Sequence, residues 1–221
     1  MPANDQADLS RIYAQRFSSQ LAYRNRVWRI LVGDFFSKYI PENASVLDLG
    51  CGYGEFINHV RAASKFGMDL NPDTPAHLNP DVKFLYQDCA QRWEIPDHSL
   101  DVVFTSNFFE HLPDKTSLGK TLDETRRCLK PGGCLIAIGP NIKHLADAYW
   151  DFWDHHVALS DASLKEALET RGFTTEACFG RFLPYTMSRK RPIPDLFIKA
   201  YLKMPVFWPF FGKQFLVVVR A

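Results

Sequence analysis

The residues best suited to bind a ligand cluster around three closely spaced glycines. Gly50, Gly52 and Gly54 alternate directly after the apolar run 46–49, which contains Asp48. Glycine lets the backbone take torsion angles closed to other residues, and it lets a ligand approach the main chain. Apolar residues at helical spacing follow. The pattern therefore predicts a strand, a tight turn and a helix over 55–63, whose first N–H groups and positive dipole end would face a ligand.

Polar residues also end two later apolar runs. Asp69 lies at the end of the run 65–70, and Asn107 follows the run 100–105. Ligands of open parallel sheets bind beyond the carboxyl ends of the strands, so both residues should border one pocket. An ionised carboxylate at Asp69 could accept hydrogen bonds from both hydroxyls of a ribose. The alternative is a turn cap, because Asp69 is followed by Asn71 and Pro72.

The pattern D-x-G-x-G-x-G resembles the first motif of the class I S-adenosylmethionine-dependent methyltransferases, and it differs from the dinucleotide fingerprint G-x-G-x-x-G. Asp69, Asp88 and the turn 130–133 resemble later elements of the same family and come in the same order. The Glu110-His111-Leu112 run is similar to the small-molecule branch, types 11 and 23. The resemblance implies S-adenosyl-L-methionine as cofactor, with Asp69 on its ribose and Asp88 on its adenine. The implied cofactor-binding residues are Asp48, Gly50, Cys51, Gly52, Gly54, Asp69, Leu70, Asp88, Cys89 and Asn107.

The family resemblance also implies an α/β fold, a Rossmann-like seven-stranded methyltransferase sheet flanked by helices. The sheet should be mostly parallel, with the last strand antiparallel between the fifth and the sixth. Patterning predicts later strands over 82–86, 134–138, 173–182 and 214–220, and helices over 115–129 and 162–171. We expect residues 1–40 to form an N-terminal helical segment that covers the cofactor pocket. Residues 41–221 then form the methyltransferase domain.

Composition favours an ordinary soluble, cytoplasmic protein. The 221 residues suit one domain, with 46% hydrophobic and 23% charged residues. A net charge of +1 gives no sign of a nucleic-acid partner. Five cysteines without a C-x-x-C pair suggest reduced thiols. The polar first residues and the lack of a long apolar run predict neither a signal peptide nor a membrane-spanning helix.

An apolar insertion at about 185–212 separates the last two predicted strands. Apolar residues recur with helical period over 193–204, aromatic residues crowd 205–211, and the basic cluster 189–191 lies just before them. Three interpretations stay open for the segment 193–211: packing on its own domain, a homodimer face, or peripheral contact with a membrane surface.

Direct methyl displacement needs alignment of the reactants, and a general base only when the acceptor is a hydroxyl or a protonated amine. His111, His155 and His156 are candidates for that base, and we rank His111 and His156 equally as catalytic residues. We expect no metal site, because the adjacent side chains of residues 154–156 diverge. The expected acceptor is a small molecule that is O-methylated, such as a sugar, a lipid-linked compound or a secondary metabolite.

Two other functions remain open from the residues. A non-catalytic module that binds S-adenosylmethionine would keep the same pocket. An NAD(P)-dependent oxidoreductase would place the third glycine one position later and usually carry a Tyr-x-x-x-Lys pair, and the sequence shows neither. A nucleic-acid methyltransferase is a third and weaker possibility, because it would normally carry a basic face and the net charge of +1 gives no sign of one.

Overall fold

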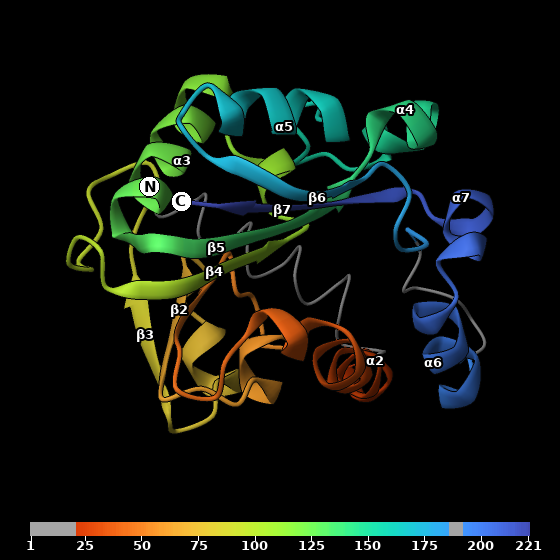
Figure 1. Ribbon diagram of the computed structural model, residues 1–221, viewed down its shortest axis with the longest axis horizontal. Coiled ribbons are helices and arrows are strands. Elements are labelled where there is room, and N and C mark those ends of the chain that lie inside the picture. The colour runs from red at the N-terminus through yellow and green to blue at the C-terminus, as the bar shows by residue number, and fades with distance from the viewer. Residues whose placement is uncertain (1–20, 186–191) are drawn as a thin grey trace.

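The computed structural model describes residues 21–185 and 192–221, and a seven-stranded sheet forms its middle layer (Figure 1). The strand order is β3-β2-β1-β4-β5-β7-β6, and β7 runs antiparallel to both β5 and β6 while the other neighbours are parallel. The predicted fold class is therefore confirmed. The strands are β1 Ser45–Leu49, β2 Ser64–Asp69, β3 Val82–Tyr86, β4 Leu100–Ser106, β5 Leu129–Pro140, β6 Thr174–Phe179 and β7 Gln214–Arg220.

Helices α3 (Lys115–Cys128) and α5 (Asp161–Glu169) cover the upper face of the sheet in Figure 1. The side chain of Asp114 caps α3 by accepting the N–H of Ser117, and Ser160 and Ser163 form a capping box at the start of α5. Such caps supply partners for the first N–H groups of a helix. Each helix then buries a leucine stripe against the sheet.

Helices α2 (Leu21–Asp34) and α6 (Asp195–Lys203) lie below the sheet in Figure 1. Trp28 of α2 makes edge-on contacts with Phe56 and Phe104, the latter from β4. α6 leads through η7 (Pro205–Phe207) into α7 (Trp208–Phe211), directly before β7. No helix among the described residues is long and apolar enough to cross a bilayer.

The helix predicted over 55–63 is wrong: only the short 3-10 helix η3, Ile57–His59, forms there. Val60 is buried and extended, because the chain must turn back at once to begin β2. The side chain of Asn58 accepts the N–H of Asn79 and donates to the carbonyl of His77, which also ties this segment to the next loop. The dipole of an α-helix is therefore missing behind the glycine turn.

The remaining short helices occupy loops that the sequence pattern left unassigned, and β5 begins before the turn 130–133 rather than after it. Of the segment 1–40, residues 1–20 lie outside the described part of the chain, as does the basic cluster 189–191. The short helices are η2 Phe36–Tyr39, η4 Thr74–His77, η5 Phe109–His111, α4 Ile142–Leu145 and η6 Ala146–Asp151.

Candidate active site

The glycine turn after β1 has the backbone that its sequence requires. Gly50, Gly52 and Gly54 have φ values of 71°, 50° and 74°, in the left-handed region that other residues rarely enter. The N–H groups of Gly50 and Cys51 both donate to the carbonyl of Met68, at 2.9 and 3.1 Å. The N–H of Gly54 donates to the carbonyl of Cys51. These hydrogen bonds close the turn and tie its first two residues to β2.

Asp69, the last residue of β2, closes the turn from the other side. Its two carboxylate oxygens accept the N–H groups of Gly52 and Asn71, each at 2.8 Å. Burial raises the pKa of Asp69, and these backbone hydrogen bonds partly oppose that shift. Asp69 therefore serves the turn-cap role left open from sequence. An ionised carboxylate has about four acceptor positions, so this role leaves capacity for a ligand.

Asp48 lies beneath the turn and is only 2% exposed. Burial raises its pKa well above the ordinary value, and the nearby charges of Asp69 and Glu55 act in the same direction. Within the described residues its Oδ2 has no hydrogen-bond partner. An unpaired buried carboxylate oxygen is costly, so Asp48 is a polar group held under the glycine turn for a reason other than core packing.

The other predicted cofactor residues differ in how their side chains lie. Asp88 is exposed and accepts the N–H of Ala90 in the turn after β3. Leu70 is half-buried beside Asp69. The thiols of Cys51 and Cys89 are buried; that of Cys89 accepts a hydrogen bond from Thr121 of α3. Both cysteines could therefore meet a ligand at this edge through the main chain only.

The loop after β4 borders the same turn. Asn107 takes a positive φ of 50°, and its N–H donates to the carbonyl of Ile138 in β5. The ring of Phe108 lies against Gly50: a Cβ added at that glycine would come within 2.3 Å of the ring. The alternation of glycines pointed to close approach by a ligand, and in this structure the approach at Gly50 is made by a phenyl ring.

His111 lies at the end of η5, in the same loop, among several polar groups. Its Nδ1 lies 3.0 Å from the carbonyl oxygen of Asp154 and 3.2 Å from its carboxylate Oδ2. Its Nε2 lies 3.9 Å from Oε1 of Glu110, which is 2% exposed. Burial alone would lower the pKa of His111, but Asp154 and Glu110 together raise it above its ordinary value. Burial also raises the pKa of Glu110 to about 7.

The two histidines that we ranked equally occupy different environments. The side chain of His156 is exposed, while its backbone N–H donates to the carbonyl of Glu110. Its neighbour His155 is buried, stacked on Phe152 and edge-on to His111, with ring centroids 4.9 Å apart in both pairs. The geometry brings His111 and His155 together and leaves His156 at the surface.

Sequence reasoning missed Glu110 and Asp154 as partners of His111. Within residues 21–185 and 192–221, one group has spacing that could hold a metal ion: donor atoms of Glu110, His111 and His155 lie within 4.8 Å of one another. The side chains of His155 and His156 do diverge, as expected. The other two metal-donor atoms of the group come from Glu110 and His111, in the loop after β4. The one sequence signal was the adjacency of Glu110 and His111 after a predicted strand.

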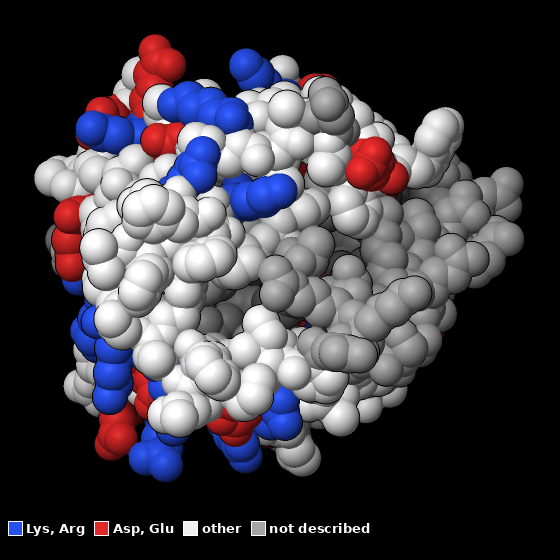
Figure 2. Space-filling view, turned by 90° about the vertical axis from the view of Figure 1, so that its right-hand side faces the viewer, with Lys and Arg blue, Asp and Glu red and all other residues white. Residues whose placement is uncertain are grey.

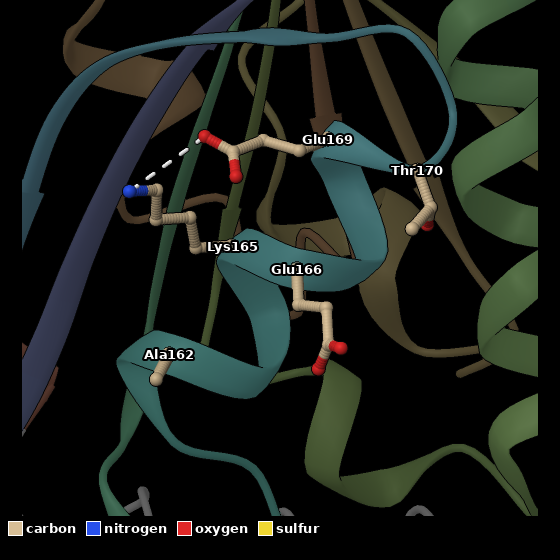
Figure 3. Close-up of a pocket in the computed structure, with 5 residues that line it drawn as sticks. All are labelled: Ala162, Lys165, Glu166, Glu169 and Thr170. Carbon is tan, nitrogen blue, oxygen red and sulfur yellow. Dashed lines mark ion pairs between the residues drawn. The ribbon is translucent and has the colours of Figure 1, made fainter.

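A separate concavity lies on the outer surface of α5 (Figure 3), lined by Ala162, Lys165, Glu166, Glu169 and Thr170. Lys165 and Glu169 face each other across one helical turn, 3.7 Å apart. Every lining residue comes from one helix and its end, and none belongs to the residues gathered at the carboxyl ends of the strands. This concavity is therefore distinct from the candidate active site.

Comparison with known proteins agrees with this geometry. A family model described as a methyltransferase domain matches residues 21–177. A Mycolicibacterium smegmatis protein named "Probable S-adenosylmethionine-dependent methyltransferase" is 33% identical over 62% of this chain and 54% of its own length. The 2-methyl-6-phytyl-1,4-hydroquinone methyltransferase of a Synechocystis species is 32% identical over 53% of this chain and 39% of its own length. The chain thus spans about half or less of these relatives.

Solved structures share the fold at lower identity. A methyltransferase from Haloferax volcanii, solved in complex with the Trm112 methyltransferase activator, gives a TM-score of 0.69 at 22% identity and covers 95% of this chain and 96% of its own. A SAM-dependent methyltransferase from Archaeoglobus fulgidus gives 0.67 at 20% identity, covering 90% and 94%. Together with the family match and the glycine turn, these likenesses lead to one conclusion. The chain belongs to the class I S-adenosylmethionine-dependent methyltransferases.

Proposed function

We propose that this enzyme O-methylates a small-molecule acceptor, with His111 taking the proton from the acceptor hydroxyl. One observation carries the assignment of the base: Nδ1 of His111 faces both the carbonyl and the carboxylate of Asp154. An imidazole whose Nδ1 donates to such acceptors keeps Nε2 free of a proton in its neutral form. His111 is half-buried, its raised pKa makes it a stronger base, and it lies in the loop that borders the glycine turn.

The glycine turn and the acids beside it fit an adenosyl group. The three glycines leave the main chain without side chains at alternate positions of the turn. Both oxygens of Asp69 keep acceptor positions beyond the N–H groups that they bind. We assign Asp69 to the ribose and Asp88 to the adenine amino group. S-adenosylmethionine supplies a methyl group already activated by its sulfonium, so the protein needs no covalent nucleophile. The chain's own task is to align the acceptor and to accept its proton.

The N-terminal segment would close this pocket. Arg24 of α2 forms an ion pair with Glu55, the residue directly after Gly54. This contact supports our expectation that residues 1–40 cover the cofactor.

The choice of a small-molecule acceptor rests on two observations. Relatives are named as a 2-methyl-6-phytyl-1,4-hydroquinone methyltransferase and a phosphoethanolamine N-methyltransferase, and both named acceptors are small molecules. Aromatic side chains of the loop 141–159 also lie around the histidines, with Phe152 stacked on His155 and Tyr149 edge-on to it. A lipid-linked phenol suits such surroundings, and we do not propose a nucleic acid. All five cysteines are free, which favours a reducing compartment such as the cytoplasm.

The test is a methylation assay with a panel of phenols, sugars and lipid-linked hydroxyl compounds, followed by mass spectrometry for the added methyl group. Removing a general base typically lowers turnover by about 10²–10⁴-fold, so His111→Gln should fall in that range. His156→Gln is the matched control and should keep full turnover, because only its backbone contacts Glu110. Equal turnover in both variants would remove the base from the proposal. Product carrying its new methyl on nitrogen or carbon would refute O-methylation.

Dialysis against a chelator distinguishes a general base at His111 from a metal centre at the same residues. If His111 acts as the base, dialysis against EDTA should leave turnover unchanged. Turnover that is lost on dialysis and restored by a divalent cation would instead assign Glu110, His111 and His155 to a metal site.

A further inference from the structure

The segment before β7 exposes an unusual number of large apolar side chains. Seven of them, which we call the apolar face, have exposed fractions between 40% and 75%. Contiguous exposed apolar surface on a folded protein generally marks an interaction site. The apolar face consists of Leu196, Phe197, Met204, Val206, Phe207, Phe210 and Phe211.

The outward direction of these side chains is set by firm packing beneath them. Trp208 is buried, and its ring meets Phe35, Phe179 and Phe182 edge-on, with centroids 4.9–5.8 Å apart. Its Nε1 donates to the carbonyl of Tyr201 at 3.0 Å. One side of the segment therefore packs into the core, and the opposite side is exposed to solvent. Packing on its own domain, one of the three interpretations of 193–211, explains only the buried side.

The charge of the chain is concentrated around the same segment. Residues 181–213 contain seven Lys or Arg and one Asp, so they carry +6 of a chain whose total is +1, and the remainder carries −5. The one acid, Asp195, is paired with Arg26 of α2, and Lys199 is paired with Asp34 of the same helix. Lys203 and Lys213 are exposed, and neither forms an ion pair with a carboxylate among the described residues.

This combination distinguishes the remaining two interpretations. A two-fold symmetric dimer places the same patch on both sides of its interface, so the unpaired Lys203 and Lys213 of the two copies would oppose each other. An anionic bilayer attracts such a segment, and its headgroup region accepts aromatic rings. Apolar exposure together with basic charge therefore favours the surface of an anionic membrane over a second copy.

The apolar face also adjoins the active-site edge of the sheet. Gln214, the first residue of β7, pairs with Pro140, the last residue of β5. The carbonyl of Lys213 accepts the N–H of Asn141, where the aromatic loop begins. Figure 2 looks onto this side of the molecule: uncharged residues fill much of the described surface, and charged residues gather toward its rim.

We propose that the apolar face of α6, η7 and α7 binds the surface of an anionic lipid bilayer, with the exposed Lys203 and Lys213 on the headgroups. Bound in this way, the enzyme receives a lipid-linked acceptor directly from the bilayer. The delivery of a lipid-linked acceptor rests on the proposed function, whereas binding to the bilayer does not.

Vesicle flotation of the full chain tests membrane binding without any acceptor. The protein should float with vesicles of phosphatidylcholine mixed with phosphatidylglycerol, should not float with phosphatidylcholine alone, and should be released by high salt. Two variants separately weaken the apolar contact and the charge contact with the bilayer. Phe210→Ser/Phe211→Ser shortens the apolar contact. Lys203→Glu/Lys213→Glu reverses two charges and should weaken binding by more than about tenfold.

A matched control carries the same charge change elsewhere. Lys83 on β3 and Lys120 on α3 are exposed and lie outside the segment, so Lys83→Glu/Lys120→Glu should bind vesicles like the wild type. Circular dichroism and binding of S-adenosylhomocysteine should be the same in all variants, which separates failed docking from failed folding or failed cofactor binding.

Four results would overturn the proposal. The wild type could ignore anionic vesicles, or the control variant could lose binding as fully as Lys203→Glu/Lys213→Glu. Light scattering could reveal a dimer that Phe210→Ser/Phe211→Ser dissociates, with no flotation, and the face would then be a subunit interface. RNA binding that survives the phenylalanine substitutions, without vesicle binding, would assign the positive charge to nucleic acid instead. Methyl transfer to a water-soluble acceptor is a separate readout and decides the proposed function on its own.

Discussion

Replacing Gly50 with alanine should disturb the glycine turn in two ways that can be measured separately. Its φ of 71° lies in the left-handed region, and a Cβ there would come within 2.3 Å of two ring atoms of Phe108. Gly132 offers a matched control. Its φ is 77°, yet a Cβ there would meet nothing within 4 Å. Alanine at either site strains the backbone, but only alanine at Gly50 displaces a neighbouring ring.

The two costs can be given magnitudes. An L-residue in the left-handed conformation loses about 1–2 kcal/mol, which is all that Gly132→Ala should take from the free energy of unfolding. Overpacking costs about 1–3 kcal/mol more, here through the half-buried ring of Phe108, so Gly50→Ala should lose about 2–5 kcal/mol in total. Moving Phe108 also deforms the turn at which we propose that the cofactor binds. The affinity for S-adenosylhomocysteine should then fall by roughly tenfold or more in Gly50→Ala, equivalent to about 1.4 kcal/mol, and stay unchanged in Gly132→Ala.

Urea titration measures the free energy of unfolding, and isothermal titration calorimetry measures the affinity for S-adenosylhomocysteine. Equal losses of stability in the two variants would show that Phe108 does not occupy the space over Gly50. Equal affinities for S-adenosylhomocysteine would refute the placement of the cofactor at this turn.

Two further predictions follow from packing and from pKa values. Trp208→Ala should lower the free energy of unfolding by about 3–5 kcal/mol in urea titration because it empties a buried site, whereas Phe210→Ala, at a side chain 74% exposed, should change it little; comparable losses would contradict the division of this segment into a buried and an exposed side. Burial raises the pKa of Glu110 from 4.5 to about 7, so between these pH values the folded state binds a proton that the unfolded state has lost. The free energy of unfolding should therefore decrease as pH rises from 4.5 to about 7, by up to about 3 kcal/mol. Glu110→Gln cannot titrate and should flatten this slope in urea titrations across pH; an unaltered slope would assign it to His111 or to other groups.

Much of the glycine turn could be predicted from sequence, because its determinants are local. Alternating glycines after a buried strand can be recognised without knowing what packs on them, and the left-handed angles at Gly50, Gly52 and Gly54 follow from that pattern. The strands could be predicted for the same reason, since apolar runs bounded by turn residues identify them. The helix over 55–63 failed because its apolar spacing was equally compatible with a short 3-10 helix that returns at once to β2.

By itself, the sequence determined the kind of fold, the glycine turn and the acids at the strand ends, since each depends on residue type and short spacing. Only the tertiary structure decided which of two adjacent histidines faces inward. That choice depends on the carbonyl of Glu110, which accepts the N–H of His156 and so leaves His155 buried beside His111. The tertiary structure also decided which apolar residues of the insertion before β7 pack into the core. Trp208 and Phe210 look alike in sequence. They differ because the rings of Phe35, directly after α2, and Phe182, shortly after β6, enclose Trp208 and not Phe210.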